Sequence, residues 1–95
     1  MSTLHSVDDY RITEHARLEM ERRGISETDL AQDLFAPGQT GEVRDGRVVF
    51  QSLVTHGEPA RAFLLRVFVD TECEPPAVVT AYRTTKIDKY WRDEP

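Results

Sequence analysis

Three side chains in the segment RITEHARLEMERRGI, residues 11–25, are of types that can act on a phosphate ester. Histidine is the residue type most often used for proton transfer near neutral pH, so His15 is a candidate to accept or donate a proton during a reaction. The guanidinium groups of Arg22 and Arg23 can bind phosphate through paired hydrogen bonds. They follow His15 by about two helical turns, so one of them is expected on the helix face that carries His15.

Each of these side chains also has a structural interpretation. His15 can hydrogen-bond a backbone carbonyl near the start of its helix, and periodicity alone favours that role. Arg22 or Arg23 can form an ion pair with Glu19 or Asp29. His15 and Glu19 are four residues apart and can share a helix face, but two ligands do not make a metal site, so we expect no metal.

Arg66 is the most informative residue of the second half of the chain. It interrupts the apolar segment ARAFLLRVFVD, residues 60–70, which is typical of a strand inside a sheet. A charge that is buried without a partner is costly, so the guanidinium must reach solvent, a carboxylate or a ligand. Because side chains alternate along a strand, Arg66 is expected on the face opposite the core.

Four polar residues near the C-terminus extend this candidate site. Thr80 and Tyr82 alternate along the last expected strand, and Arg83 and Lys86 follow. A threonine, a phenol and several cations on one sheet surface would suit a phosphodiester. The structural alternatives are packing for Tyr82, a surface ion pair for Arg83 and simple solvation for Lys86.

The elements that position these residues can be predicted from local signals. Thr13 is expected to cap a helix that ends at Gly24, and Ser26 a second helix that ends at Pro37 and Gly38. Asp45-Gly46 is the strongest hairpin signal in the chain. The expected strands lie on either side of that turn within residues 41–54, and at 60–70 and 77–83, before a short helical tail.

Helices followed by an antiparallel meander are typical of an α+β fold. We expect two N-terminal helices on one face of a three- to four-stranded antiparallel sheet, a short C-terminal helix, and a partly open second face. Residues 1–95 form one expected domain, in which residues 1–10 are a loose lead-in.

Charge and composition restrict the function classes. The net charge of −5 disfavours nonspecific binding to nucleic acid, although residues 78–92 hold four basic residues and one acidic residue. Tyr90 and Trp91 are expected to pin the tail to the body, or alternatively to stack an unpaired base. Cys73 is the single cysteine, no apolar span or signal peptide is recognisable, and we therefore expect a cytoplasmic protein without a membrane partner.

The segments ITEHARLEMERRGIS, GRVVFQ, LLRVFVD and VVTAYRTTKIDKYW together resemble a family of small bacterial domains of unknown function. The pattern of that family opens with Thr-x-His-Ala, continues with Met-x-x-Arg-Gly-Ile and closes with Val-Thr-x-Tyr-Arg. The resemblance spans residues 10–92. The family is similar to the BrnT toxins and, more distantly, to the RelE/ParE toxin superfamily.

This resemblance implies a metal-free ribonuclease that needs no cofactor and that turns the 2′-OH of RNA onto the adjacent phosphate. Such a reaction needs a base, an acid and cations for the charge that develops on the phosphate. The implied catalytic residues are His15 as base or acid, Arg66 and Arg83 at the phosphate, and Tyr82 to orient it.

The implied substrate-binding residues are Arg22, Arg23 and Lys86. The implied partners are RNA, either messenger RNA or RNA at the ribosome, and an antitoxin-like protein. A non-catalytic protein-interaction module on the same fold is the alternative, and the acidic net charge favours it. That module would carry an exposed apolar patch around Leu64 and Phe68. A third hypothesis is RNA binding without cleavage, and the oligomeric state stays open.

Overall fold

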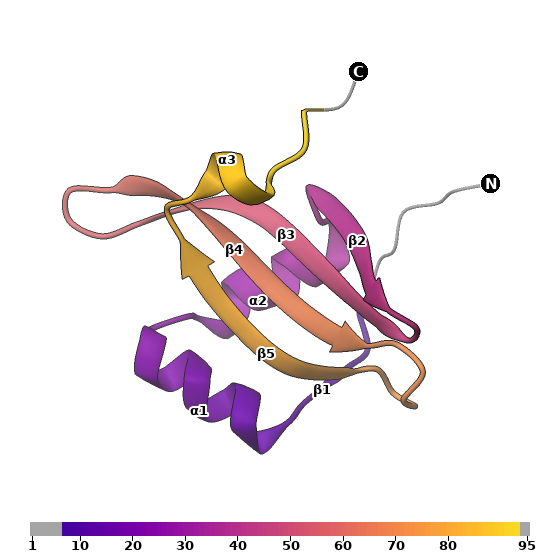
Figure 1. Cartoon of the computed structure of the whole chain (residues 1–95). Coiled ribbons are helices and arrows are strands. Elements are labelled where there is room, and N and C mark those ends of the chain that lie inside the picture. The colour runs from indigo at the N-terminus through magenta and orange to yellow at the C-terminus, as the bar shows by residue number, and fades with distance from the viewer. Residues whose placement is uncertain (1–6, 94–95) are drawn as a thin grey trace.

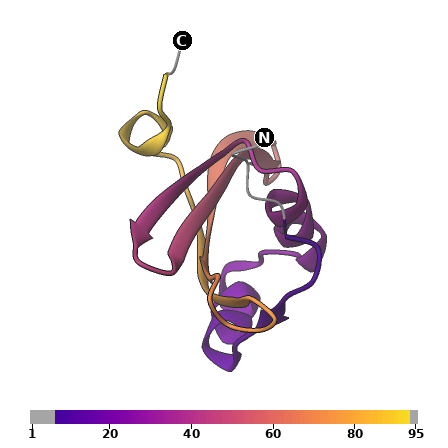
Figure 2. The ribbon, with the colours of Figure 1, turned by 90° about the vertical axis from the view of Figure 1, so that its right-hand side faces the viewer.

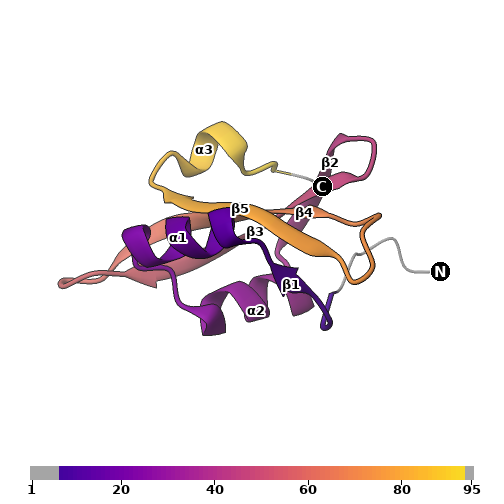
Figure 3. The ribbon, with the colours of Figure 1, turned by 90° about the horizontal axis from the view of Figure 1, so that it is seen from below.

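The computed structural model describes residues 7–93 and has the α+β architecture that the sequence predicts (Figure 1). One sheet carries α1 and α2 on one side and the short helix α3 on the other (Figure 3). Figure 2 shows the same arrangement from the edge, with the yellow C-terminal helix opposite the two purple helices. Within residues 7–93, no helix is long and apolar enough to cross a membrane.

Both long helices begin and end at the expected signals. Helix α1 covers Glu14–Arg23, the Thr13 hydroxyl accepts a hydrogen bond from the Ala16 amide at 3.2 Å, and Gly24 ends the helix with φ +68°. Helix α2 covers Glu27–Phe35, and the Ser26 hydroxyl accepts from the Asp29 amide at 3.1 Å. These caps satisfy amide groups that have no partner within the helix.

The sheet has five strands in the order β1-β5-β4-β3-β2. The strands are β1 (Arg11–Ile12), β2 (Gln39–Arg44), β3 (Arg47–His56), β4 (Arg61–Asp70) and β5 (Ala77–Thr84), and α3 is Ile87–Tyr90. Strands β2 to β5 form the expected antiparallel meander, and the hairpin turns at Asp45-Gly46.

The prediction of a three- to four-stranded antiparallel sheet is wrong in one respect. Strand β1 pairs with β5 in parallel, which makes the sheet mixed and adds a fifth strand. A strand of two residues has no readable alternation, so its sequence gave no signal. In the expected lead-in, residues 1–6 lie outside the described residues, whereas Val7 and Tyr10 pack against the core and the Val7 amide donates to the Leu34 carbonyl at 2.7 Å.

The hydrophobic core lies between the sheet and α1 and α2. Alternate residues of the two central strands face the helices, and their register pairs Phe50 with Val67. They pack against Leu30 and Leu34 of α2 and Met20 of α1, all of which are buried. The large apolar side chains therefore concentrate on one face of the sheet, as the alternation in the sequence predicts.

The exposed apolar patch expected around Leu64 and Phe68 is not present at Leu64. This residue is 0% exposed, so no exposed patch centres on it. Leu64 does lie on the face opposite the core, paired in register with Leu53, but α3 lies over this end of β4 and β5 (Figure 1). Phe68 is half-buried, and its ring stacks against Tyr82 with 6.1 Å between the ring centroids.

One carboxyl group is enclosed where α2 packs on β3. Asp33 is 1% exposed, and its Oδ1 accepts a hydrogen bond from the Ser52 hydroxyl. Its Oδ2 has no hydrogen-bond partner among the described residues. Burial raises the pKa of Asp33 to about 7, and the hydrogen bond from Ser52 opposes that rise only in part.

This group makes the stability of the fold depend on pH. The pKa of Asp33 in the folded state, about 7, exceeds its ordinary value of 3.8, so the folded state binds the proton more tightly. The resulting stabilisation is complete below about pH 4 and is lost as the pH rises through 7. A shift of three units corresponds to about 4 kcal/mol at most.

Between pH 4.5 and pH 8, the free energy of unfolding of the wild type is therefore expected to fall as Asp33 loses its proton. In Asp33→Asn this fall should be smaller by about 2–4 kcal/mol. Urea denaturation at a series of pH values measures this difference. Asp45→Asn is the control, because the hairpin turn accepts Asn-Gly as well as Asp-Gly. Equal pH dependence in Asp33→Asn and the wild type would contradict the prediction.

Candidate functional site

Arg66 lies at the centre of a polar and aromatic cluster on the sheet face that carries α3. Its Nη1 donates to the Tyr82 hydroxyl at 2.8 Å, and its Nε donates to Oε1 of Gln51 at 3.0 Å. The register places both partners directly opposite it on the neighbouring strands. The guanidinium also lies 4.0 Å from the ring centroid of Tyr90. We call Arg66, Gln51, Tyr82 and Tyr90 the Arg66 cluster.

The cluster positions a phenol whose proton is held less tightly than usual. The hydrogen bond with Tyr82 is the largest cause that lowers the pKa of Tyr90. Burial opposes it, and the positive charges of Lys89 and Arg66 lower the pKa further. A phenol in this state loses its proton at a lower pH than free tyrosine, so a larger fraction is in the phenolate form that can act as a general base.

The C-terminal segment crosses this face and partly covers it. Gln51 donates through Nε2 to the Tyr90 carbonyl at 3.2 Å, and Gln39 exchanges two hydrogen bonds with the backbone of Arg92, at 2.6 and 3.1 Å. The Arg92 guanidinium donates to the Thr40 carbonyl at 2.9 Å. The face that was expected to be partly open is therefore crossed from β5 to β2 by its own tail.

The position of Trp91 explains why a glycine stands at the start of β2. A Cβ on Gly38 would lie 2.8 Å from the Trp91 ring and 3.2 Å from the Gln51 carbonyl. A contact of 2.8 Å is essentially never seen at a real Cβ, so a larger residue must displace the indole. The expected role of Tyr90 and Trp91 as pins of the tail agrees with these contacts.

Gly38→Ala is expected to shift Trp91 fluorescence emission to longer wavelength and to increase its quenching by acrylamide, because the displaced indole becomes more exposed to water. Trp91 is the only tryptophan, so the signal reports the tail alone. The main unfolding transition should stay within about 1 kcal/mol of the wild type, since the tail adds little core area. Gly41→Ala, in β2 three residues later, is the matched control, because a Cβ there meets no atom closer than 3.4 Å. An unchanged spectrum in Gly38→Ala would refute this account of the tail.

A second polar group joins α1 to the free edge of β5. Glu19 is buried, its Oε1 accepts from the Thr80 hydroxyl, and the same oxygen lies 3.2 Å from Nη1 of Arg23. Arg23 also donates to the Ala81 carbonyl at 3.0 Å. The other carboxylate oxygen of Glu19 lies 3.2 Å from Nε2 of His15. Side chains of α1 thus satisfy backbone groups of β5 beyond the point where β1 ends.

The two polar groups reach β5 at neighbouring positions on one strand face. Thr80 pairs in register with Phe68 and Tyr82 pairs with Arg66, so both point away from the core. Residues two apart on a strand are about 6–7 Å apart. The side chain of His15 is 70% exposed beside this edge. The structure therefore links His15, through Glu19 and Thr80, to the strand position next to the Arg66 cluster.

Arg83 does not join the Arg66 cluster. It pairs in register with Leu65, which faces the core, so it lies on the side of the sheet that carries α1. Its guanidinium donates to the carbonyls of Arg23 and Gly24 at 2.6 and 3.2 Å. Arg83 therefore binds the C-terminal end of α1, where carbonyl groups lack helical partners and attract positive charge.

The three expected substrate-binding residues do not form one group: Arg22 and Arg23 end α1, whereas Lys86 precedes α3 on the other side of the sheet (Figure 3). Arg23 forms an ion pair with Glu19 and a hydrogen bond to the Ala81 carbonyl, whereas Arg22 is exposed on α1. Lys86 is exposed at the N-terminal end of α3. Of these three, Lys86 is on the element that lies over the Arg66 cluster.

Sequence reasoning missed two members of the site. Gln51 follows three apolar residues on β3 and is 1% exposed, and its amide holds both Arg66 and the tail. Its signal was a polar residue in an apolar strand, the same signal that identified Arg66. The sequence indicates Glu19 only as an ion-pair partner of an arginine or as a neighbour of His15 on one helix face, because its long-range bond to Thr80 has no local signature.

Glu19→Ala is expected to destabilise the fold by about 2–4 kcal/mol at pH 7, because Arg23 and Thr80 lose a buried partner. The hydrogen bond from Thr80 is the largest cause that lowers the pKa of Glu19, so its contribution is present above pH 4.5 and falls as the carboxylate is protonated. Chemical denaturation at pH 7 and pH 3 measures both effects. Glu21→Ala, an exposed acid on the same helix, should change stability by less than about 0.5 kcal/mol.

No protein-family model, curated protein or solved structure matches the chain. The functional proposal therefore depends on the Arg66 cluster, the His15–Glu19 pair and the chemistry of these groups.

Proposed function

We propose that the protein is a metal-independent endoribonuclease of the toxin–antitoxin type. The observation that supports this most directly is the position of Arg66. Its guanidinium hydrogen-bonds the hydroxyl of Tyr82 and lies over the ring of Tyr90, and the neighbouring strand β5 is linked to the His15–Glu19 pair through Thr80. This arrangement places a cation next to two groups that can move protons, which is what cleavage of RNA by its own 2′-OH requires.

The guanidinium of Arg66 has N–H groups left with which it can bind a phosphate. An arginine carries five N–H groups, and the described residues account for one on Nε and one on Nη1. The remaining three have no hydrogen-bond acceptor among residues 7–93. Gln51 and Tyr82 fix the plane of the guanidinium, so that a bidentate contact with phosphate would cost little side-chain entropy.

The proton transfers can be assigned to groups in or beside the cluster. A base removes the proton of the 2′-OH, O2′ attacks phosphorus, and the bond from phosphorus to the 5′ oxygen breaks as that oxygen receives a proton. The products are a 2′,3′-cyclic phosphate and a 5′-hydroxyl end. Tyr90, whose pKa is lowered, serves as the base. His15, held by Glu19, serves as the acid in its imidazolium form.

Charge limits where RNA can bind. The chain has a net charge of −5, but the C-terminal segment that crosses this face contributes Lys86, Lys89 and Arg92. RNA binding is therefore confined to the face that carries α3. It weakens as salt rises, because cations of the salt compete with these side chains for phosphate, and the small number of phosphate contacts keeps this dependence shallow. The proposal includes an antitoxin-like protein partner that neutralises the activity.

Purified protein is expected to cut a single-stranded RNA, alone or on translating ribosomes, and to leave 2′,3′-cyclic phosphate ends. Substitution of deoxyribose on the 5′ side of the cut should abolish cleavage, because the nucleophile is removed. Arg66→Ala should slow cleavage by about 10²–10³-fold, and His15→Ala by about 10²-fold. Gel electrophoresis and end-group analysis measure both effects.

Arg61→Ala is the matched control. It removes the same charge from the same strand, but Arg61 is an exposed residue that stacks on Phe63, on the other face of the sheet. It should cleave at the wild-type rate. RNA left intact with and without ribosomes, or equal rates for Arg66→Ala and Arg61→Ala, would reject the proposed function.

A further inference from the structure

The edge of β3 beyond Gln51 has no neighbouring strand among the described residues. Strand β2 pairs with β3 only as far as Gln39 opposite Gln51, whereas β4 continues to pair with β3 as far as His56. Residues 52–56 therefore present one row of backbone N–H and C=O groups that no strand of residues 7–93 covers. An edge of this kind is a template for pairing with another chain.

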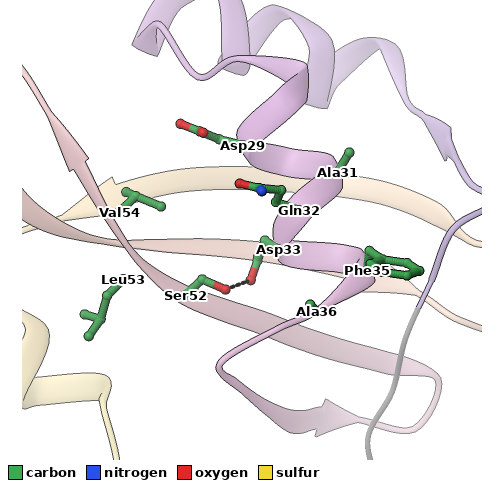
Figure 4. Close-up of a pocket in the computed structure, with 9 residues that line it drawn as sticks. All are labelled: Asp29, Ala31, Gln32, Asp33, Phe35, Ala36, Ser52, Leu53 and Val54. Atoms are coloured by element: carbon green, nitrogen blue, oxygen red, sulfur yellow. Dashed lines mark hydrogen bonds between the residues drawn. The ribbon is translucent and has the colours of Figure 1, made fainter.

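A groove runs along this edge, between β3 and α2 (Figure 4). Its volume is about 520 Å³, and its apolar lining comes from Ala31 and Phe35 of α2, from Ala36 directly after that helix, and from Val54 of β3. Leu53 points away from α2, towards the opposite side of the strand (Figure 4), and is 53% exposed. Apolar side chains thus lie on both sides of the same unpaired strand edge.

The charged residues of the groove have one sign. Asp29 lies at its rim and Asp33 contributes to its wall, and no lysine or arginine lines it. Asp33 is 1% exposed and burial raises its pKa to about 7, so Asp29 at the rim supplies the charge that a docked chain can reach. A group that docks here should therefore bring positive charge or hydrogen-bond donors together with apolar side chains.

We propose that the edge of β3 is a docking site for an extended segment of a partner protein, which adds to the sheet as a further strand beside residues 52–56. Its backbone pairs with β3. Its side chains alternate between the α2 groove and the surface around Leu53, and a lysine or arginine among them faces Asp29. Strand addition of this kind combines backbone hydrogen bonds for affinity with pockets for alternate side chains.

Charge argues against a second copy of this chain as the occupant. Symmetric pairing through β3 would bring Asp29 of both copies to the same interface, in a protein whose net charge is −5. Like charges that approach at an interface cost affinity. A basic segment of another protein meets no such repulsion, and the proposal does not depend on ribonuclease activity.

A phage-displayed library of random 12-residue peptides, selected on the full chain, tests the chemistry of the occupant. Selected peptides are expected to alternate apolar residues with a period of two and to be enriched in lysine or arginine. Synthetic peptides should bind with affinities that an N-methyl scan lowers at least tenfold at every second amide and little at the others. Amide chemical shifts should change at residues 52–56 and on α2.

Protein variants test the location. Leu53→Lys and Asp29→Lys should each weaken binding of the same peptide at least tenfold. Leu18→Lys is the matched control, because Leu18 is 52% exposed on α1, away from this groove. The proposal is overturned if no peptide is enriched, if the selected peptides are acidic, if the N-methyl scan has no period, or if Leu18→Lys weakens binding equally. Sedimentation that shows a dimer disrupted by Leu53→Lys would assign the edge to a second copy instead.

Discussion

An arginine in the middle of the central strand decides how the two faces of the sheet are built. Arg66 stands between Leu65 and Val67, which are buried against the helices. Its own side chain therefore projects to the other face, which cannot close into a second apolar core without burying an unpaired charge. Gln51, Tyr82 and the ring of Tyr90 supply the missing partners. One face is a hydrophobic core, and the other is polar and aromatic.

The edge of β5 also has polar groups that need partners. Beyond the two residues that pair with β1, the edge needs partners for its backbone, and α1 supplies them through charged side chains. The carboxylate of Glu19 serves Thr80, Arg23 and His15 together. Because the helix is attached by a buried carboxylate, the imidazole one turn earlier is held at the edge of the sheet. The exposure of His15 follows from this attachment and not from a loose helix end.

The sequence predicts the parts of this fold that depend on neighbours in the chain. Thr13, Ser26 and Asp45-Gly46 act within a few residues, so their caps and their turn are recognisable without tertiary information. The contact of Trp91 with Gly38 joins residues that are far apart in sequence and has no local signature. The position of Arg83, in contrast, follows from local alternation. Arg83 comes directly after Tyr82, so the alternation that places Tyr82 opposite Arg66 places Arg83 on the other face, in register with Leu65.

The proposed docking edge of β3 and the Arg66 cluster lie close together on β3. Leu53, at the edge of β3, lies on the same sheet face as Gln51 and two residues from it along the strand. Gln51 holds both Arg66 and the carbonyl of Tyr90. A strand added beside Leu53 would border the tail segment that covers Arg66, and would limit its displacement by RNA. If both proposals hold, a partner bound in the groove between β3 and α2 would restrain the tail segment that covers Arg66. It would do so from the other face of the sheet, without contacting Arg66.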